Sequence, residues 1–298
     1  MSDVAVQRGA PSEGQWKQEF VAIIRAASGG LLFGVPLLYT MEVWWAGEHT
    51  ETRQMLLILA LLAVVLVVLN HTAGFRSTKD VRLRDAVADT VEALAIGIVT
   101  TTAVLVMLRV VTIETPTLSA MGKVINECVP FCLGIGVARF LLSGDPHMTD
   151  QDYSAESDSR AARAPSRPLN ASIADVGATI LGATFIGLSI APTDEIPMVT
   201  AGMSPIWLVV VLITSLVASY AIVFVAGFAR QGDRHEQEGI FQRPAVETIV
   251  TYLVALGVAA FLLWLFQRDI WPASDLLDRA IVLGFPATIG GAVGRLAL

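Results

Sequence analysis

Charged residues are scarce in this chain, and apolar residues fill most of the space between them. Only 16% of the 298 residues are charged, 54% are hydrophobic, and the mean hydropathy is +0.63. Soluble domains carry about 25% charged residues, so this composition excludes an ordinary soluble domain. The N-terminal segment is polar and lacks the apolar core and cleavage site of a signal peptide. We therefore expect the first apolar helix to remain in the mature protein.

Motifs that indicate an enzyme or a bound cofactor are also missing. The sequence contains no P-loop, zinc-protease helix, dinucleotide fingerprint or retinal-type lysine in the last helix. Ser215 and Ser219 have no plausible base on an otherwise apolar segment, and the four histidines fall in loops or at helix ends. Cys128 and Cys132 are more often small apolar fillers than metal ligands in such a helix. We expect no enzymatic activity, no cofactor and no nucleic-acid partner, whereas the residues leave a metal site undecided.

Eight apolar segments are long enough to cross a bilayer, which takes about 20 residues. They are Phe20–Trp45, Met55–Phe75, Ala86–Val111, Leu118–Leu142, Ile173–Met198, Pro205–Phe228, Ala245–Phe266 and Leu276–Leu298. The sequence therefore predicts an all-α, polytopic membrane protein whose main partner is the lipid bilayer.

Basic residues cluster before the first predicted span and in alternate loops. They are Arg8, Lys17 and Arg25, then Arg76, Lys79, Arg82 and Arg84, then Arg160, Arg163 and Arg167, and finally Arg230, Arg234 and Arg243. The intervening loops are acidic or nearly uncharged. Because positive charge resists translocation, we expect a multi-pass protein of the inner (cell) membrane with both termini in the cytoplasm.

The two halves of the chain repeat each other. Without a gap, Lys123 to Leu141 and Arg279 to Ala297 share a basic residue, a proline, a glycine, a valine and an arginine. Other matched pairs, in the same order, are Gly29 and Gly182, Gly34 and Gly187, Thr40 and Thr193, Glu42 and Glu195, and Thr90 and Thr248. We predict a first four-helix repeat over residues 1–142, a flexible cytoplasmic linker over 143–170, and a second repeat over 171–298. Since each repeat has an even number of spans, the two should be parallel, related by an axis along the membrane normal.

Two short motifs carry a resemblance to a known family. The segments PLLYTMEVWW (Pro36–Trp45) and APTDEIP (Ala191–Pro197), within an eight-span layout, resemble a family of uncharacterised integral membrane proteins from prokaryotes. The similarity covers the chain from about Trp16 onward. This resemblance implies the fold and a membrane location, but no activity, because the family is a domain of unknown function.

Carboxylates near the outer ends of the first and fifth spans are the first candidate site. Glu42, Glu195 and Asp194 lie next to prolines, which free backbone carbonyls by removing a donor. Carboxylates and freed carbonyls are ligands for a hard cation or a relayed proton. Lys123 and Arg279 are predicted at similar depth, so Glu42–Lys123 and Glu195–Arg279 ion pairs are an equally open alternative.

A second group of charges is predicted near the cytoplasmic ends. Asp89 and Glu247 occupy equivalent positions in the third and seventh spans, and Arg139 and Arg295, in the fourth and eighth, could neutralise them. These charges are therefore candidates for a pathway or for structural ion pairs.

Glu127 and Glu92 have no evident repeat-related partner. An unpaired carboxylate inside the membrane indicates function, because ionising it in a low dielectric is costly and its protonation acts as a switch. Glu127 is the preferred proton or ion site.

From these residues the sequence predicts a transporter or channel for a small cation. Whether transport is coupled to protons, and whether the protein forms a homo-oligomer, are both left open. The alternative is a non-transporting scaffold or sensor with structural salt bridges. A water-accessible tunnel between the repeats, bordered by Glu42 and Glu195, would favour transport. A dry, fully packed interface would favour the scaffold.

Overall fold

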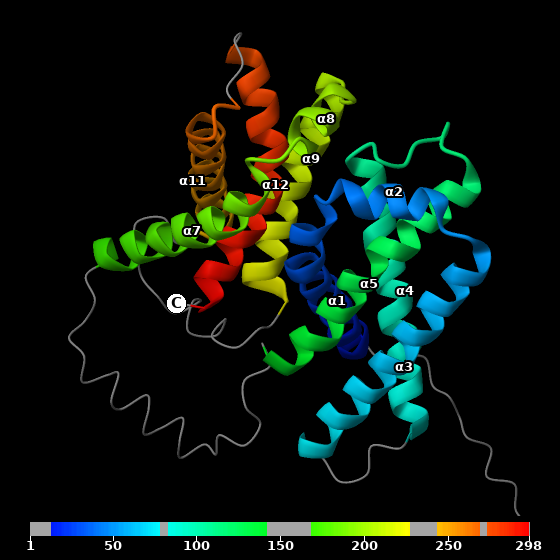
Figure 1. The fold of residues 1–298 in the computed structure, drawn as a ribbon. Helices are drawn as coiled ribbons and strands as arrows, with labels where there is room; N and C mark the ends of the chain where they lie inside the picture. Colours follow the sequence, from blue (N-terminus) through cyan, green and yellow to red (C-terminus); the bar gives the residue numbers. More distant parts are fainter. Residues whose placement is uncertain (1–12, 78–82, 142–167, 227–242, 269–272, 298) are drawn as a thin grey trace, which may run out of the picture.

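The computed structural model describes residues 13–77, 83–141, 168–226, 243–268 and 273–297, and within them the regular structure is helical throughout (Figure 1). The first half contains α1 (Glu13–Leu38), α2 (Met41–His49), α3 (Thr52–Ser77), α4 (Leu83–Met107) and α5 (Thr117–Leu141). The second half contains α7 (Pro168–Ile190), α8 (Glu195–Ala201), α9 (Pro205–Tyr220), the π-helix η1 (Ala221–Val225), α11 (Pro244–Leu265) and α12 (Ala273–Ala297).

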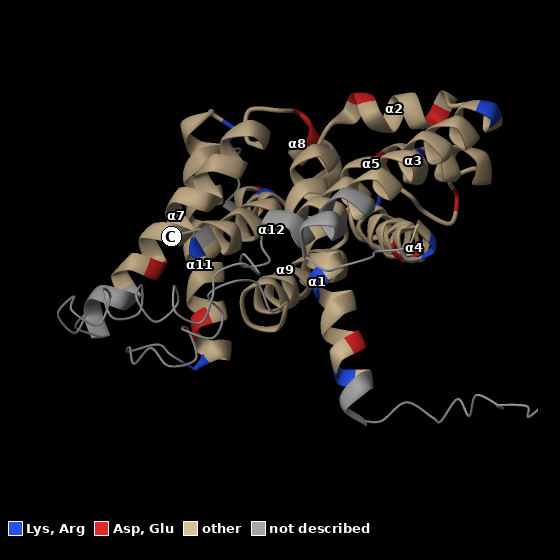
Figure 2. Cartoon of the chain, turned by 90° about the horizontal axis from the view of Figure 1, so that it is seen from below, with Lys and Arg blue, Asp and Glu red and all other residues tan. Residues whose placement is uncertain are grey.

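Within this described part, eight helices have the length and apolarity needed to cross a membrane, in agreement with the eight predicted spans. They are α1, α3, α4, α5, α7, α9 continued by η1, α11 and α12. Figure 2 shows that residues other than Lys, Arg, Asp and Glu make up most of every helix. The all-helical, multi-pass membrane fold predicted from the sequence is therefore confirmed.

The first and fifth predicted spans are too long, and the structure corrects both. The predicted helix over Phe20–Trp45 breaks after Leu38, and the one over Ile173–Met198 breaks after Ile190. Thr40 is extended, with φ −132° and ψ 97°, and Pro192 disfavours helical backbone at the residue before it. The two short helices α2 and α8 follow these breaks, so Glu42 and Glu195 lie outside the long spanning helices.

Glycines set the closest helix contacts in both halves. A Cβ atom on Gly134 of α5 would meet the carbonyl oxygen of Gly29 on α1, and one on Gly290 of α12 would meet that of Gly182 on α7. Small residues permit such close approach of helix backbones in membranes. These two glycine pairs occupy equivalent positions in the two halves of the sequence.

A second matched detail ends α4 and α11. Arg109 (φ 62°) and Gln267 (φ 56°) adopt the left-handed conformation just after these helices. The N–H of Arg109 donates to Val106 O at 3.1 Å, and that of Gln267 donates to Trp264 O at 3.0 Å. Both helices thus end in the same left-handed cap, which satisfies carbonyls of the last turn.

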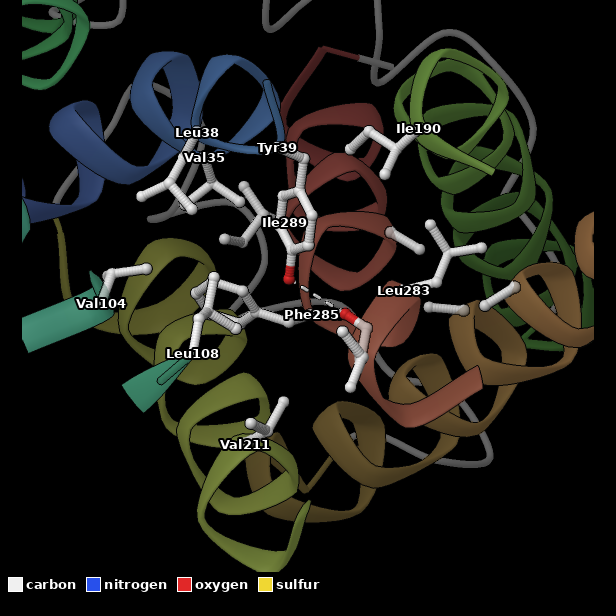
Figure 3. Packing of buried hydrophobic residues seen from close by; sticks show 14 of the residues in the cluster. Val35, Leu38, Tyr39, Val104, Leu108, Ile190, Val211, Leu283, Phe285 and Ile289 are labelled. Atoms are coloured by element: carbon white, nitrogen blue, oxygen red, sulfur yellow. Dashed lines mark hydrogen bonds between the residues drawn. The ribbon is translucent and has the colours of Figure 1, made fainter. Parts of the chain in front are cut away.

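The halves meet through an apolar core (Figure 3). Leu38 and Tyr39 at the end of α1 and Leu108 after α4 pack in one cluster with Phe285 and Ile289 of α12. The hydroxyl of Tyr39 donates to the backbone oxygen of Val282 at 3.1 Å, a buried link between the halves. The predicted linker over 143–170 lies almost entirely outside the described residues, because α7 begins at Pro168.

Candidate functional site

A groove of about 980 Å³ runs along the first half of the protein. Its walls come from α1, α2, α3 and α5, and most of its lining is apolar. Four apolar lining residues are also exposed on the molecule: Phe33 (41%), Leu37 (55%), Leu61 (58%) and Val65 (45%). Since these side chains belong to spanning helices, the groove opens where lipid would surround the protein.

The polar end of this groove lies beneath α2. Its polar lining residues are Thr40, Glu42, Asn126 and Glu127. Glu127 on α5 is completely buried (0% exposed), and neither of its carboxylate oxygens has a hydrogen-bond partner among the described residues. An isolated buried carboxylate is too costly to stay charged, so it takes up a proton or requires a cation.

Two further polar atoms beside Glu127 are also unsatisfied. The buried indole N–H of Trp44 on α2 interacts with the Glu127 carboxyl group, but it lies outside the geometry of a full hydrogen bond. The Asn126 side chain donates to Thr50 Oγ1 at 3.2 Å, while its own oxygen has no donor there. Because buried polar groups normally have partners, this cluster is suited to hold a proton, a water molecule or a small cation.

Glu195 is also buried (6% exposed), at the start of α8. One of its oxygens accepts the backbone N–H of Met41 at 3.2 Å, and its other oxygen has no partner in the described structure. Glu195 therefore joins the second half to the N-terminus of α2, where a negative charge is stabilised by the helix dipole. It does not pair with Arg279, whose guanidinium donates instead to the backbone oxygen of Arg268 at 3.0 Å.

The predicted Glu42–Lys123 ion pair is also corrected. Lys123 lies 3.8 Å from Glu48, almost two turns further along α2, and Glu42 is exposed while lining the groove. The break after α1 causes this difference, because α2 starts a new direction on which Glu48, not Glu42, reaches α5. Gly47 of α2 packs directly against the α5 backbone at Lys123, which fixes this register.

Asp194 is exposed and pairs with a residue that the sequence did not indicate. Arg268, after α11, donates to Asp194 at 2.6 Å and also to the backbone oxygen of Pro192. This ion pair holds the segment between α7 and α8, so Asp194 has a structural partner at the surface.

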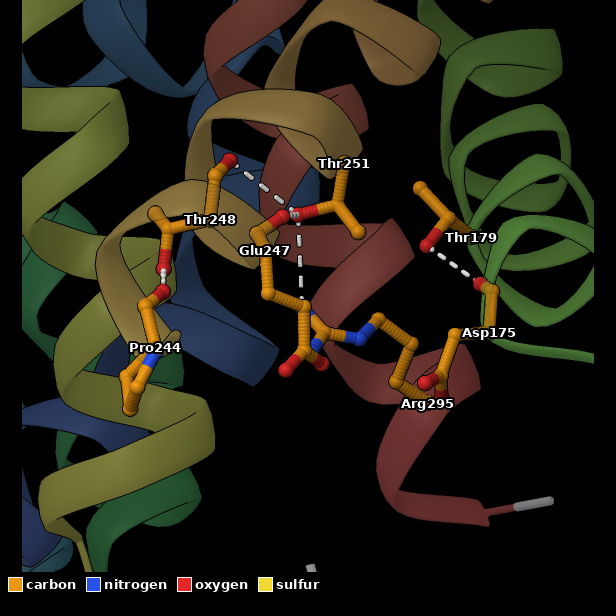
Figure 4. Close-up of polar contacts among 7 residues, drawn as sticks. All are labelled: Asp175, Thr179, Pro244, Glu247, Thr248, Thr251 and Arg295. Carbon is orange, nitrogen blue, oxygen red and sulfur yellow. Dashed lines mark hydrogen bonds and ion pairs between the residues drawn. The ribbon is translucent and has the colours of Figure 1, made fainter. Parts of the chain in front are cut away.

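The predicted pairing of Arg295 with Glu247 is confirmed (Figure 4). Arg295 of α12 is 1% exposed and donates to Glu247 and to Thr251 Oγ1 on α11, the latter at 3.3 Å. Figure 4 shows Asp175 of α7 near the Arg295 side chain, on the side away from Glu247. This cluster neutralises a deeply buried arginine and ties α12 to α11.

The equivalent cluster of the first half is only partly described. The side chain of Arg139 lies outside the described residues, so its predicted pairing with Asp89 stays a prediction. Asp89 is partly buried on α4, and Glu92 is exposed one turn later. The structure therefore brings Glu127, Glu42 and, through Met41, Glu195 around α2, but leaves Asp89, Glu92 and Glu247 elsewhere.

Two site residues escaped the sequence reasoning. They are Trp44 and Asn126, neither of which is among the site residues predicted from the sequence. The adjacent Asn126-Glu127 pair inside an apolar helix was a usable signal, whereas nothing in the sequence placed Trp44 against α5. The described residues hold no group of three or more His, Cys, Asp and Glu suited to a metal ion.

This arrangement defines a multi-pass, helical integral membrane protein with buried carboxylates around the short helix α2. Residues 22–298 match the family described as "Putative integral membrane protein (DUF2391)", and the chain belongs to that family. Searches of the curated proteins and of the solved structures found no match.

Proposed function

We propose that this protein is a membrane transporter or channel for a small cation or a proton, with Glu127 as the ion-binding carboxylate. The observation that carries the proposal is the complete burial of Glu127 without a cationic partner in the described structure, beside a groove lined by exposed apolar residues; its neighbouring donor, the Trp44 indole, makes no full hydrogen bond. A structural carboxylate at this depth would need a cationic or donor partner. Glu195, also buried and half satisfied, is the second carboxylate of the proposed path.

The proposed ion path lies along the groove of the first half and not at the interface between the two halves. Much of the described interface between the halves is packed with apolar side chains, including Leu38, Leu108 and Phe285 (Figure 3). A pocket of about 270 Å³ lies between Trp44 and Lys123 of the first half and Val199 of the second, but neither Glu42 nor Glu195 lines it. This packing favours the rival function, a scaffold or sensor that transports nothing. Glu127 distinguishes the two, because a scaffold has no use for a buried carboxylate without a partner. We therefore assign the site to the groove of the first half.

We further infer that the protein is built from two parallel four-helix repeats. The paired glycine contacts at Gly134 and Gly290 support this, as do the left-handed caps at Arg109 and Gln267. The site itself is not repeated: α12 carries Leu283 where α5 carries Glu127. The first repeat would then supply the ion-binding carboxylate Glu127, and the second would contribute Glu195 to the path and the Arg295–Glu247 pair to its support.

The proposal is tested by flux into proteoliposomes across a panel of cations, with and without a pH gradient. Wild-type protein should carry a proton or cation current, and Glu127→Gln should abolish it while the protein stays folded and monodisperse. Glu195→Gln should reduce it strongly, because the amide keeps the acceptor for Met41 but supplies no full negative charge. Glu114→Gln, in the exposed turn after α4, is the matched control and should leave flux unchanged.

Absence of flux in wild-type protein under every gradient would replace this proposal with the scaffold. Flux in Glu127→Gln at the wild-type rate would move the path away from the groove. We propose an inner-membrane location with cytoplasmic termini for this activity, on the distribution of basic residues alone.

A further inference from the structure

The groove beside Glu127 has the chemistry of a site for an amphiphile. One end holds the oxygen acceptors of Glu42, Asn126 and Glu127, and none of the described residues that line the groove is basic. Glu127 and Asn126 each offer buried acceptor atoms that lack a donor in the described structure. A ligand that satisfies this end must supply positive charge and N–H donors.

The rest of the groove is apolar and elongated. Its α5 wall extends from Asn126 to Val137, which covers about 16 Å along a helix. This is about the length of an extended dodecyl chain. Leu61 and Val65 of α3 and Phe33 of α1 face the same space and are exposed to lipid. A bare metal ion would leave this long apolar part unused.

We propose that the groove binds an amphipathic ammonium ion, with its alkyl chain along α3 and α5 and its head at Glu127. This inference rests on the proposed function, because it takes Glu127 as the carboxylate that holds a cation. Charge complementarity selects this occupant over a phospholipid, whose phosphate would meet the oxygens of Glu42, Asn126 and Glu127 and no basic side chain of the lining. It also selects it over an uncharged helix of a second copy, which would leave the acceptors of Glu127 unsatisfied.

The chemistry of the head group explains how binding and proton movement are linked. Glu127 starts as a neutral carboxylic acid. When the ammonium ion arrives, the Glu127 O–H bond breaks, the proton leaves to water, and the carboxylate forms a charge-assisted hydrogen bond with the ammonium N–H. No net charge is added to the groove in this exchange. A single carboxylate cannot hold both the proton and the ammonium ion, so the two compete.

The test uses the full-length protein in nanodiscs of phosphatidylcholine and a photoreactive dodecylamine whose reactive group lies near the chain end. We expect label on the groove walls of α3 and α5. Unlabelled dodecylamine should compete at least about tenfold better than dodecanol, because the charged hydrogen bond adds to the same chain burial. Glu127→Gln should remove this preference.

Two substitutions on α3 separate the groove from general lipid contact. Val65→Trp fills a lining position and should reduce labelling, whereas Val64→Trp is the matched control, because Val64 is exposed (62%) but lies outside the lining. Equal competition by dodecanol and dodecylamine, or unchanged labelling in Val65→Trp, would overturn the proposal. Labelling with this selectivity in a protein that shows no flux would keep the binding site and reject transport. Flux without such labelling would keep the transport function and reject the binding site for an amphiphile.

Discussion

At the scale of single residues, the buried carboxylates are of two kinds. Glu247 is neutralised by Arg295, whereas Glu127 has no partner among the described residues. The difference between them is the presence of a cation beside Glu247. A paired carboxylate holds helices together, and an unpaired one is free to exchange a proton.

Breaking the Arg295–Glu247 pair should destabilise the protein strongly. Glu247→Gln removes the carboxylate that accepts from the buried guanidinium of Arg295, and breaking a buried pair costs about 3–5 kcal/mol. Arg295→Met should have a similar effect, and the double change should recover much of the loss. Thermal unfolding in detergent, followed by circular dichroism, measures this. Additive losses in the double variant would mean that the two side chains are not coupled.

The Lys123–Glu48 pair, which is exposed at its carboxylate end, provides the contrast. The two side chains are 3.8 Å apart, and Glu48 is 46% exposed whereas Lys123 is 13% exposed. Glu48→Gln should therefore change stability by less than about 1 kcal/mol in the same measurement. A loss of stability as large as that of Glu247→Gln would show that solvent exposure does not determine how much each ion pair contributes to stability.

At the scale of elements, the sequence predicted the spanning helices but not the breaks in two of them. Hydropathy continues across Tyr39 and Ala191, so apolar length alone joined α1 to α2 and α7 to α8. Pro192 was a usable signal for the second break. For the first, Pro36 lies within α1, and the helix continues two residues beyond it. The predicted ion pairs of Lys123 with Glu42 and of Arg279 with Glu195 were wrong for this reason, because the short helices start in new directions.

The crossing of α7 and α12 should depend on glycine at one position and not at another on the same helix. In Gly182→Ala the new Cβ would collide with the backbone of Gly290, so we expect a loss of about 1–3 kcal/mol. The new Cβ atom in Gly177→Ala would have no neighbouring atom within 4 Å, so this change should be neutral or slightly stabilising, because alanine favours the helical conformation. Detergent unfolding curves of the two variants decide this. Equal stability of both would contradict the close crossing.

At the scale of the whole molecule, composition and hydropathy were enough for the fold class. The interface between the halves was beyond sequence reasoning, because Leu38, Leu108 and Phe285 are indistinguishable from lipid-facing residues by composition. The groove was equally hidden, since its apolar lining lies on three long helices that are distant in sequence. Of its lining, the sequence indicated Glu127, as a lone carboxylate in an apolar helix, and Glu42.

Topology is the property of the whole molecule that basic residues predict. In a variant without Cys128 and Cys132, a cysteine at Ser157 should react with an impermeant reagent only from the cytoplasmic side. A cysteine at Ile113, in the fully exposed turn between α4 and α5, should react from the periplasmic side of intact cells. The opposite pattern would invert the proposed orientation.

The most direct measurement of the central claim is proton release from Glu127 on cation binding. Dodecylamine hydrochloride is added to purified protein in weakly buffered nanodiscs, and the pH change is recorded against empty nanodiscs. We predict release of up to one proton per wild-type chain and none from Glu127→Gln, with Glu114→Gln behaving as wild type. Equal release from wild type and Glu127→Gln, or no release from wild type, would contradict Glu127 as the carboxylate that exchanges a proton for a cation.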